Sequence, residues 1–140
     1  MPVQFFFLEK NISLQNRSQL KGFIESIFKK EKKKLDGLVY IFCSDDYLLQ
    51  INRSHLKHDY YTDIITFELS SIPGTISGEI YISTDRVRDN ANTLAVSLKE
   101  ELHRVIFHGA LHLCGYKDKS SRDAKLMRQA EDSCLAQYFS

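Results

Sequence analysis

One segment constrains this chain more than any other: the run VIFHGALHLC at residues 105–114, which is apolar on every side of a helix apart from two histidines. Upstream, Ser97-Leu98-Lys99-Glu100 has the capping-box pattern that opens a helix, and Gly115 is the residue type that most easily adopts the left-handed conformation that ends one. A helix that is apolar all round is buried. We therefore predict a buried helix that ends near Leu113, within a single domain spanning residues 1–140.

The rest of the chain alternates between strand-like and helical periods. Short apolar or β-branched runs predict four strands, at residues 3–8, 38–43, 64–67 and 78–83. Helical spacing predicts one helix that begins near Arg17 and ends in the lysines of residues 29–34, and a second that follows a cap at Ser44. A third is predicted to begin at Asp85, and the last to follow a cap at Ser120 or Ser121. The last helix is predicted to bury Leu126, Met127, Ala130 and Leu135, and residues 52–63 are predicted to form a loop. This order predicts an α+β fold with a small mixed four-stranded sheet packed with helices.

The two histidines of the buried helix, His108 and His112, are four residues apart. This spacing places both imidazoles on one helical face, with Cβ atoms about 5–6 Å apart, where both can reach one ion. Gly115 lets the chain reverse, so that Asp118 can return towards the two rings. Two imidazoles and one carboxylate leave positions on a divalent ion for water or a phosphate oxygen, which indicates hydrolysis or phosphoryl transfer. The alternative is that the histidines share a face without binding an ion and that Asp118 is a turn residue.

Residues 108–116, HGALHLCGY, resemble the HGxLHLxGY core of the YbeY family. TDIITF at residues 62–67 and GEIYIS at residues 78–83 resemble the family's TDVLSF and GDIxIS strands, and Asn90-Ala91 and Glu101 also fit. This resemblance implies a fold akin to metalloprotease catalytic domains, one zinc ion, and endoribonuclease activity on single-stranded RNA. It also implies a role in maturing the 3′ end of 16S rRNA and in ribosome quality control, with proteins of the small ribosomal subunit as partners.

Two positions depart from the family pattern. The third ligand is commonly a histidine and is Asp118 here, and a carboxylate is a competent zinc ligand that also tolerates iron, manganese or nickel. Where many relatives place a functionally important arginine, this chain has Leu56, which cannot bind phosphate. Lys57 and His58 are the nearest substitutes as RNA contacts, unless both lie in a solvated loop. Because of Leu56, the competing prediction is a ribosome-assembly binding factor whose metal is mainly structural.

Other polar residues leave two interpretations open. Glu101 lies seven residues before His108, and it either positions water or an imidazole at the metal or stabilises the first turn of the helix. The lysines at positions 29, 30, 32, 33 and 34 either contact RNA or form a solvated helix end.

His55 and His103 are predicted to be surface or capping residues. No glutamate follows His108, which argues against peptide hydrolysis of the HExxH type. A metallohydrolase acting on a small phosphorylated substrate would need a deep pocket instead.

Charge and cysteine content narrow the function classes further. The formal net charge is +1, so the chain lacks the positive field of a general nucleic-acid coat protein, and any RNA contact must be local. Its three cysteines are an odd number without close pairing, which suits a reducing cytosol. The apolar run near the N-terminus is too short for a signal sequence, and no later run could span a bilayer. We expect a cytoplasmic protein with no membrane partner.

Overall fold

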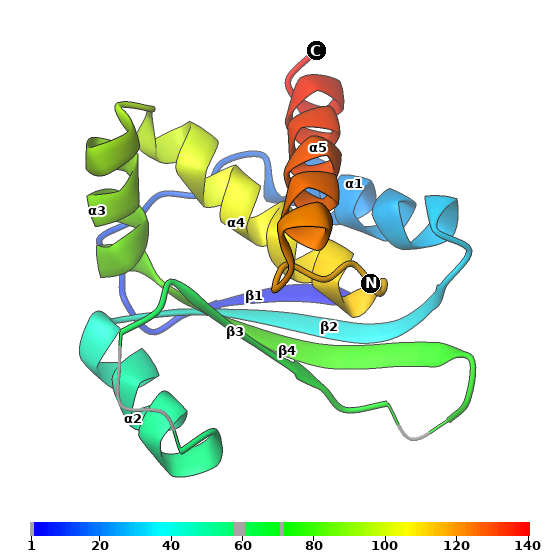
Figure 1. The fold of residues 1–140 in the computed structure, drawn as a ribbon, viewed down its shortest axis with the longest axis horizontal. Helices are drawn as coiled ribbons and strands as arrows, with labels where there is room; N and C mark the ends of the chain where they lie inside the picture. Colours follow the sequence, from blue (N-terminus) through cyan, green and yellow to red (C-terminus); the bar gives the residue numbers. More distant parts are fainter. Residues whose placement is uncertain (1, 58–60, 71) are drawn as a thin grey trace.

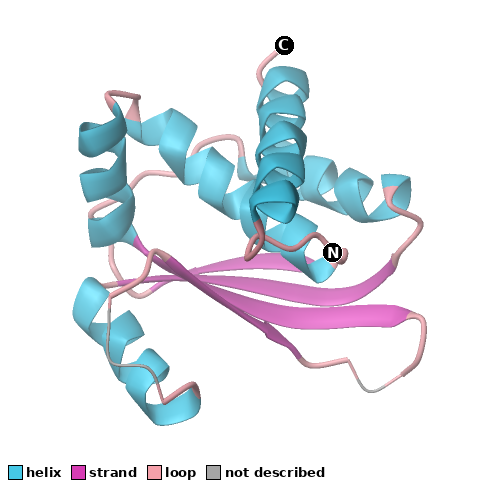
Figure 2. Ribbon diagram, in the orientation of Figure 1, coloured by secondary structure: helices cyan, strands magenta, loops and turns pink. Residues whose placement is uncertain are grey.

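The computed structural model describes residues 2–57, 61–70 and 72–140. Its centre is a four-stranded sheet with the strand order β1-β2-β4-β3. The strands are β1 (Val3–Phe7), β2 (Lys34–Cys43), β3 (Ile64–Glu68) and β4 (Thr75–Ser83). Strands β1, β2 and β4 run parallel, and β3 pairs antiparallel with β4 (Figure 2). The predicted α+β class with a mixed four-stranded sheet is therefore confirmed.

Five helices accompany this sheet in the described part of the chain: α1 (Arg17–Lys30), α2 (Asp45–His55), α3 (Thr84–Leu94), α4 (Leu98–Leu113) and α5 (Ser121–Tyr138). Figure 1 shows α1, α4 and α5 on one side of the sheet and α2 on the other. Helix α4 packs against three other helices, α1, α3 and α5, and against strands β3 and β4. This is the buried helix that the apolar run predicted. Among the described residues, no helix combines the length and apolar composition needed to cross a bilayer.

Serine side chains cap the helices where the sequence placed them. The Ser97 hydroxyl accepts a hydrogen bond of 3.0 Å from the backbone N–H of Glu100 and so begins α4. Ser44 caps α2 in the same way, and Ser120, rather than Ser121, caps α5. Each cap satisfies one of the backbone N–H groups that a helix N-terminus leaves without a partner.

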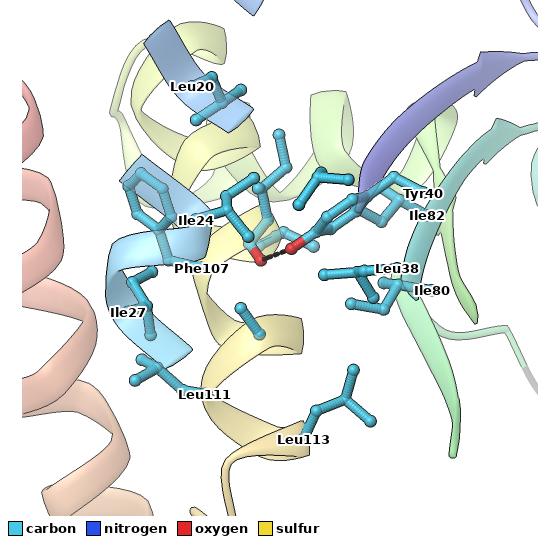
Figure 3. Close-up of a cluster of buried hydrophobic side chains, with 14 of the residues drawn as sticks. Leu20, Ile24, Ile27, Leu38, Tyr40, Ile80, Ile82, Phe107, Leu111 and Leu113 are labelled. Atoms are coloured by element: carbon cyan, nitrogen blue, oxygen red, sulfur yellow. Dashed lines mark hydrogen bonds between the residues drawn. The ribbon is translucent and has the colours of Figure 1, made fainter. Parts of the chain in front are cut away.

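The main core lies between the sheet and helices α1 and α4. Every second side chain of β2 and β4 points into it, as expected for strands with one covered face. Figure 3 shows four of them, Leu38, Tyr40, Ile80 and Ile82, and Phe42 and Ile76 are buried as well. The buried Tyr40 hydroxyl donates a 2.8 Å hydrogen bond to the carbonyl of Ile106. At Gly109, α4 lies so close to the sheet that a Cβ atom would be 2.8 Å from Cδ1 of Ile80. Gly109 therefore fixes how closely His108, its neighbour, approaches the sheet.

Several predicted boundaries were wrong. Residues 52–55 were predicted as loop but form the last turn of α2, where Asn52 is buried beside Leu48 and Leu49. The lysine tail of α1 is shorter than predicted, because α1 ends at Lys30 and Lys34 already pairs with Thr75 in the sheet. Strand β4 likewise begins at Thr75 rather than at residue 78. Both extensions come from pairing between β2 and β4, which a local pattern does not reveal.

The buried face of α5 also differs from the prediction. Met127 is buried as expected, and Ala130 and Leu135 are partly buried against the core. Leu126 was predicted to be buried but is 47% exposed. The buried face instead continues from Met127 to Glu131 and Cys134, so the helix is rotated by about one residue relative to the predicted orientation.

The predicted surface position was right for His55 and wrong for His103. His55 is exposed at the end of α2. His103 is 4% exposed, and its Nδ1 donates a 2.7 Å hydrogen bond to the carbonyl of Lys99. Its ring stacks on Tyr138 with centroids 5.5 Å apart, so aromatic packing from the end of α5 covers it.

Candidate metal centre

His108 and His112 of α4 and Asp118 of the following turn line one pocket of about 540 Å³. Residues of β3 and α5 form its other walls, and Leu56 lies at the end of α2 on its boundary. The two histidines are one helical turn apart, so they lie on the same side of α4, and this side faces the pocket. Gly115, with φ at 109°, takes the left-handed conformation that turns the chain back towards Asp118.

His108 is held in one orientation by a carboxylate from α5. Its Nδ1 lies 2.6 Å from Oε2 of Glu131, and because a carboxylate only accepts, Nδ1 carries the proton. Glu131 is itself fixed by Arg104, whose Nη1 donates a 3.1 Å hydrogen bond to Oε1. The Nε2 atom of His108 is then left as the outward nitrogen, 3.4 Å from Oδ2 of Asp118. A carboxylate that holds the far nitrogen of an imidazole is the usual support of a metal-ligating histidine.

The electrostatics of the pocket favour positive charge at His108. Burial alone lowers the pKa of His108, but the hydrogen bond and charge of Glu131 and the charges of Asp118 and Asp63 outweigh it. The pKa of His108 therefore lies above its ordinary value. The same carboxylates that stabilise a proton on this ring would stabilise a cation beside it.

The donor set fits a divalent ion in part. Two ligands about 2.0–2.1 Å from a tetrahedral zinc ion are about 3.3–3.4 Å apart, which matches the separation of His108 Nε2 and Asp118 Oδ2. His112 is exposed and lines the same pocket. Within residues 2–57, 61–70 and 72–140, no group of three or more His, Cys, Asp or Glu side chains is already arranged to hold an ion. Two of the three predicted ligands therefore lie together, and the complete ligand set stays a prediction.

Two further carboxylates, from Asp63 and Glu101, line the pocket. Burial raises the pKa of both groups above its ordinary value, and for Glu101 the neighbouring charge of Asp63 raises the pKa further. Asn90 donates a 3.3 Å hydrogen bond to Asp63. Glu101 is 5% exposed and lies in the first turn of α4. The role of orienting the imidazole, which the sequence offered to Glu101, belongs to Glu131.

The sequence did not identify Glu131 or Asp63 as members of the site. Glu131 has one sequence signal, its position four residues after Met127 on a helix that must bury one face. A glutamate on a buried face needs a partner, and here the partners are His108 and Arg104. Asp63 directly precedes β3, and its place in the pocket depends on how β3 pairs with β4.

Of the two predicted RNA contacts, the structure describes Lys57, which follows Leu56 in the chain. Leu56 is 39% exposed and belongs to the pocket lining. Lys57 is exposed, adopts a positive φ of 56°, and does not belong to the lining. His58 is outside the described residues. The role of Lys57 and His58 in binding RNA therefore remains a prediction.

Comparisons with known proteins identify the family of this chain. The family model described as endoribonuclease YbeY matches residues 7–139. A relative named endoribonuclease YbeY from Cytophaga hutchinsonii is 52% identical over 133 residues, which cover 94% of this chain and 93% of the relative. A second, from Christiangramia forsetii, is 44% identical over 131 residues, covering 94% and 91% of the two chains.

A solved structure has a similar fold. The solution structure of TM1509 from Thermotoga maritima superposes with a TM-score of 0.65 at 25% identity, covering 98% of this chain and 89% of that one. The family match spans almost the whole chain, including both histidines, Asp118 and the α5 helix that supplies Glu131. The chain therefore belongs to the endoribonuclease YbeY family.

Proposed function

We propose that this protein is a metal-dependent endoribonuclease that cleaves single-stranded RNA, with a zinc ion held by His108, His112 and Asp118. The observation that carries the proposal is the geometry of His108 in a chain of this family: Nδ1 is fixed by buried Glu131 and Nε2 faces Asp118. The names of the relatives support RNA as the substrate. The open face of the pocket towards Asp118, which is 44% exposed, leaves access for a chain from solvent.

A bound divalent ion supplies Lewis acidity and lowers the pKa of a water molecule. The residues of this chain prepare the pocket for that chemistry. Glu131 keeps the proton of His108 on Nδ1, so the Nε2 lone pair stays directed at the pocket. The carboxylate of Glu101 is part of no hydrogen bond or ion pair among the described residues, and this buried group, whose pKa is raised by burial, is placed to accept a proton from attacking water.

We further propose that the natural substrate is the 3′ region of 16S rRNA, within ribosome maturation and quality control in the cytoplasm, with proteins of the small subunit as partners. The family resemblance of residues 108–116 supports this assignment. The near-neutral net charge of +1 fits a protein that is brought to its RNA by a specific partner rather than by charge alone.

The test is cleavage of a single-stranded RNA carrying the 3′ end of 16S rRNA, beside the same RNA in a duplex. The protein is stripped of metal, reloaded with zinc, and compared with an Asp118→Ala variant purified identically to control for contaminating nucleases. We expect zinc-dependent cleavage of the single strand, and a loss of at least about 100-fold in the variant. Zinc-dependent stabilisation without cleavage by the wild type would instead support the assembly factor with a structural metal.

A further inference from the structure

Apart from its two histidines, the pocket around His108 holds more acidic than basic side chains. Asp63, Glu101, Asp118 and Glu131 line it, and among the described residues its cationic side chains apart from the histidines are Arg104 and Arg128. A phosphodiester is an anion, and its approach to these carboxylates is unfavourable without a nearby positive charge. The proposed zinc ion supplies part of this positive charge, and a guanidinium in this wall that is free to contact the phosphate would supply more.

Arg104 is not free. Its Nη1 lies 3.1 Å from Oε1 of Glu131 and its Nη2 lies 2.7 Å from Oδ1 of Asp132. The side chain is only 12% exposed. A phosphate could pair with Arg104 only by displacing Glu131 or Asp132, and displacing Glu131 would release the imidazole of His108. Arg104 therefore supports the site and does not bind the substrate.

Arg128 is in the opposite situation. Its side chain is exposed and is part of no hydrogen bond or ion pair among the residues that the structure describes. It lies three residues before Glu131 on α5, so both side chains project from the same wall of the pocket. The pKa of Glu101 is raised by burial and lowered by the charges of Arg104 and Arg128, so the field of Arg128 reaches the pocket interior. Leu56 lines the same pocket and contributes no charge.

We propose that Arg128 is the residue that binds the scissile phosphate in this chain. The inference rests on the proposed function, because it assumes that a phosphodiester enters the pocket. A guanidinium offers paired N–H donors that match two phosphate oxygens, and it stabilises the charge that develops there during attack. With Arg128 in this place, the pocket has its phosphate-binding cation from α5 and needs none at Leu56.

The experiment compares Arg128→Ala with Lys125→Ala, an exposed cation of the same helix that does not belong to the pocket lining. Zinc content and thermal unfolding confirm that each variant is folded and loaded. Single-turnover cleavage of single-stranded RNA is measured for both. RNA affinity is measured in metal-free protein over a range of salt concentrations. A double variant, Leu56→Arg with Arg128→Ala, returns a guanidinium to the pocket from the α2 side.

We expect Arg128→Ala to lose about 10²–10³-fold in cleavage rate with its zinc retained, and to reduce the salt slope of RNA affinity by about 0.7. Lys125→Ala should keep the wild-type rate, and the double variant should regain part of the lost rate. An Arg128→Ala protein that matches Lys125→Ala in rate and salt slope would overturn the proposal, as would a double variant with no recovery. If the wild type fails to cleave, the proposed function falls, and the salt slopes alone still decide whether Arg128 contacts phosphate.

Discussion

Replacing Glu131 with glutamine tests whether this carboxylate, by holding the imidazole of His108, prepares the proposed metal centre. The carboxylate accepts two hydrogen bonds from charged or polarised donors, 2.6 Å from His108 Nδ1 and 3.1 Å from Arg104 Nη1. In Glu131→Gln one oxygen becomes an NH2 group, which points a donor at a donor. One of the two bonds must therefore be lost or rearranged, and His108 loses its fixed orientation.

The size of the effect follows from these contacts. A hydrogen bond to a charged group contributes about 1.5–3 kcal/mol, so the variant should lose about that much in free energy of unfolding. Loss of the partner that orients a ligand histidine typically lowers metal affinity by about 10–100-fold, equivalent to about 1.4–2.7 kcal/mol. We expect zinc affinity in Glu131→Gln to fall within this range while the protein remains folded.

Zinc affinity is measured by competition with a colorimetric chelator, and stability by urea unfolding of the metal-free protein. The matched control is Asp132→Asn, because Asp132 contacts the other end of Arg104, is 57% exposed and does not contact His108. The control should bind zinc as the wild type does. Wild-type zinc affinity in a folded Glu131→Gln protein would refute the claim that this carboxylate prepares His108 for metal binding.

Two further predictions concern the fold. Gly109→Ala should lower the free energy of unfolding by about 1–3 kcal/mol in urea titrations, because its Cβ would lie 2.8 Å from Ile80 Cδ1. Gly22→Ala, in open space on α1, should instead stabilise by about 0.5–1 kcal/mol, and equal effects at the two glycines would contradict the close approach of α4 to the sheet. Burial, and then the charges of Glu9, Asp45 and Asp85, raises the pKa of Cys43 to about 12. This shift stabilises the folded protein below the pKa of an unfolded cysteine, about 8.5, and the stabilisation is lost as the pH rises towards 12. The free energy of unfolding should therefore fall more steeply with pH in the wild type than in Cys43→Ala, by up to about 1.4 kcal/mol per pH unit. If the free energy of unfolding falls equally with pH in the two proteins, the raised pKa of Cys43 is rejected.

The sequence predicted best where the signals are local. The α4 helix has its cap at Ser97, its apolar run and its terminating Gly115 within 19 consecutive positions, 97–115, and the structure reproduces it. The contact between His108 and Asp118 was also predictable, because only one helical end and one turn separate them. The family resemblance rests on the same stretch.

Contacts between distant segments were not predictable. Glu131 reaches His108 across 23 residues, and the apolar pattern of α5 placed Leu126 in the core without identifying Glu131 as a member of the site. A rotation of the helix by about one residue leaves Leu126 exposed, and packing of α5 on α4 decides this rotation. His103 was misassigned for the same reason, since Tyr138 covers it from the far end of α5.

The central claim is that His108, His112 and Asp118 hold one catalytic divalent ion. Its most direct test is a crystal structure of the zinc-loaded protein, with anomalous difference maps recorded above and below the zinc absorption edge. We expect a single zinc peak about 2.0–2.2 Å from His108 Nε2, from a ring nitrogen of His112 and from a carboxylate oxygen of Asp118. A zinc peak elsewhere, or none in this pocket at full zinc loading, would contradict it.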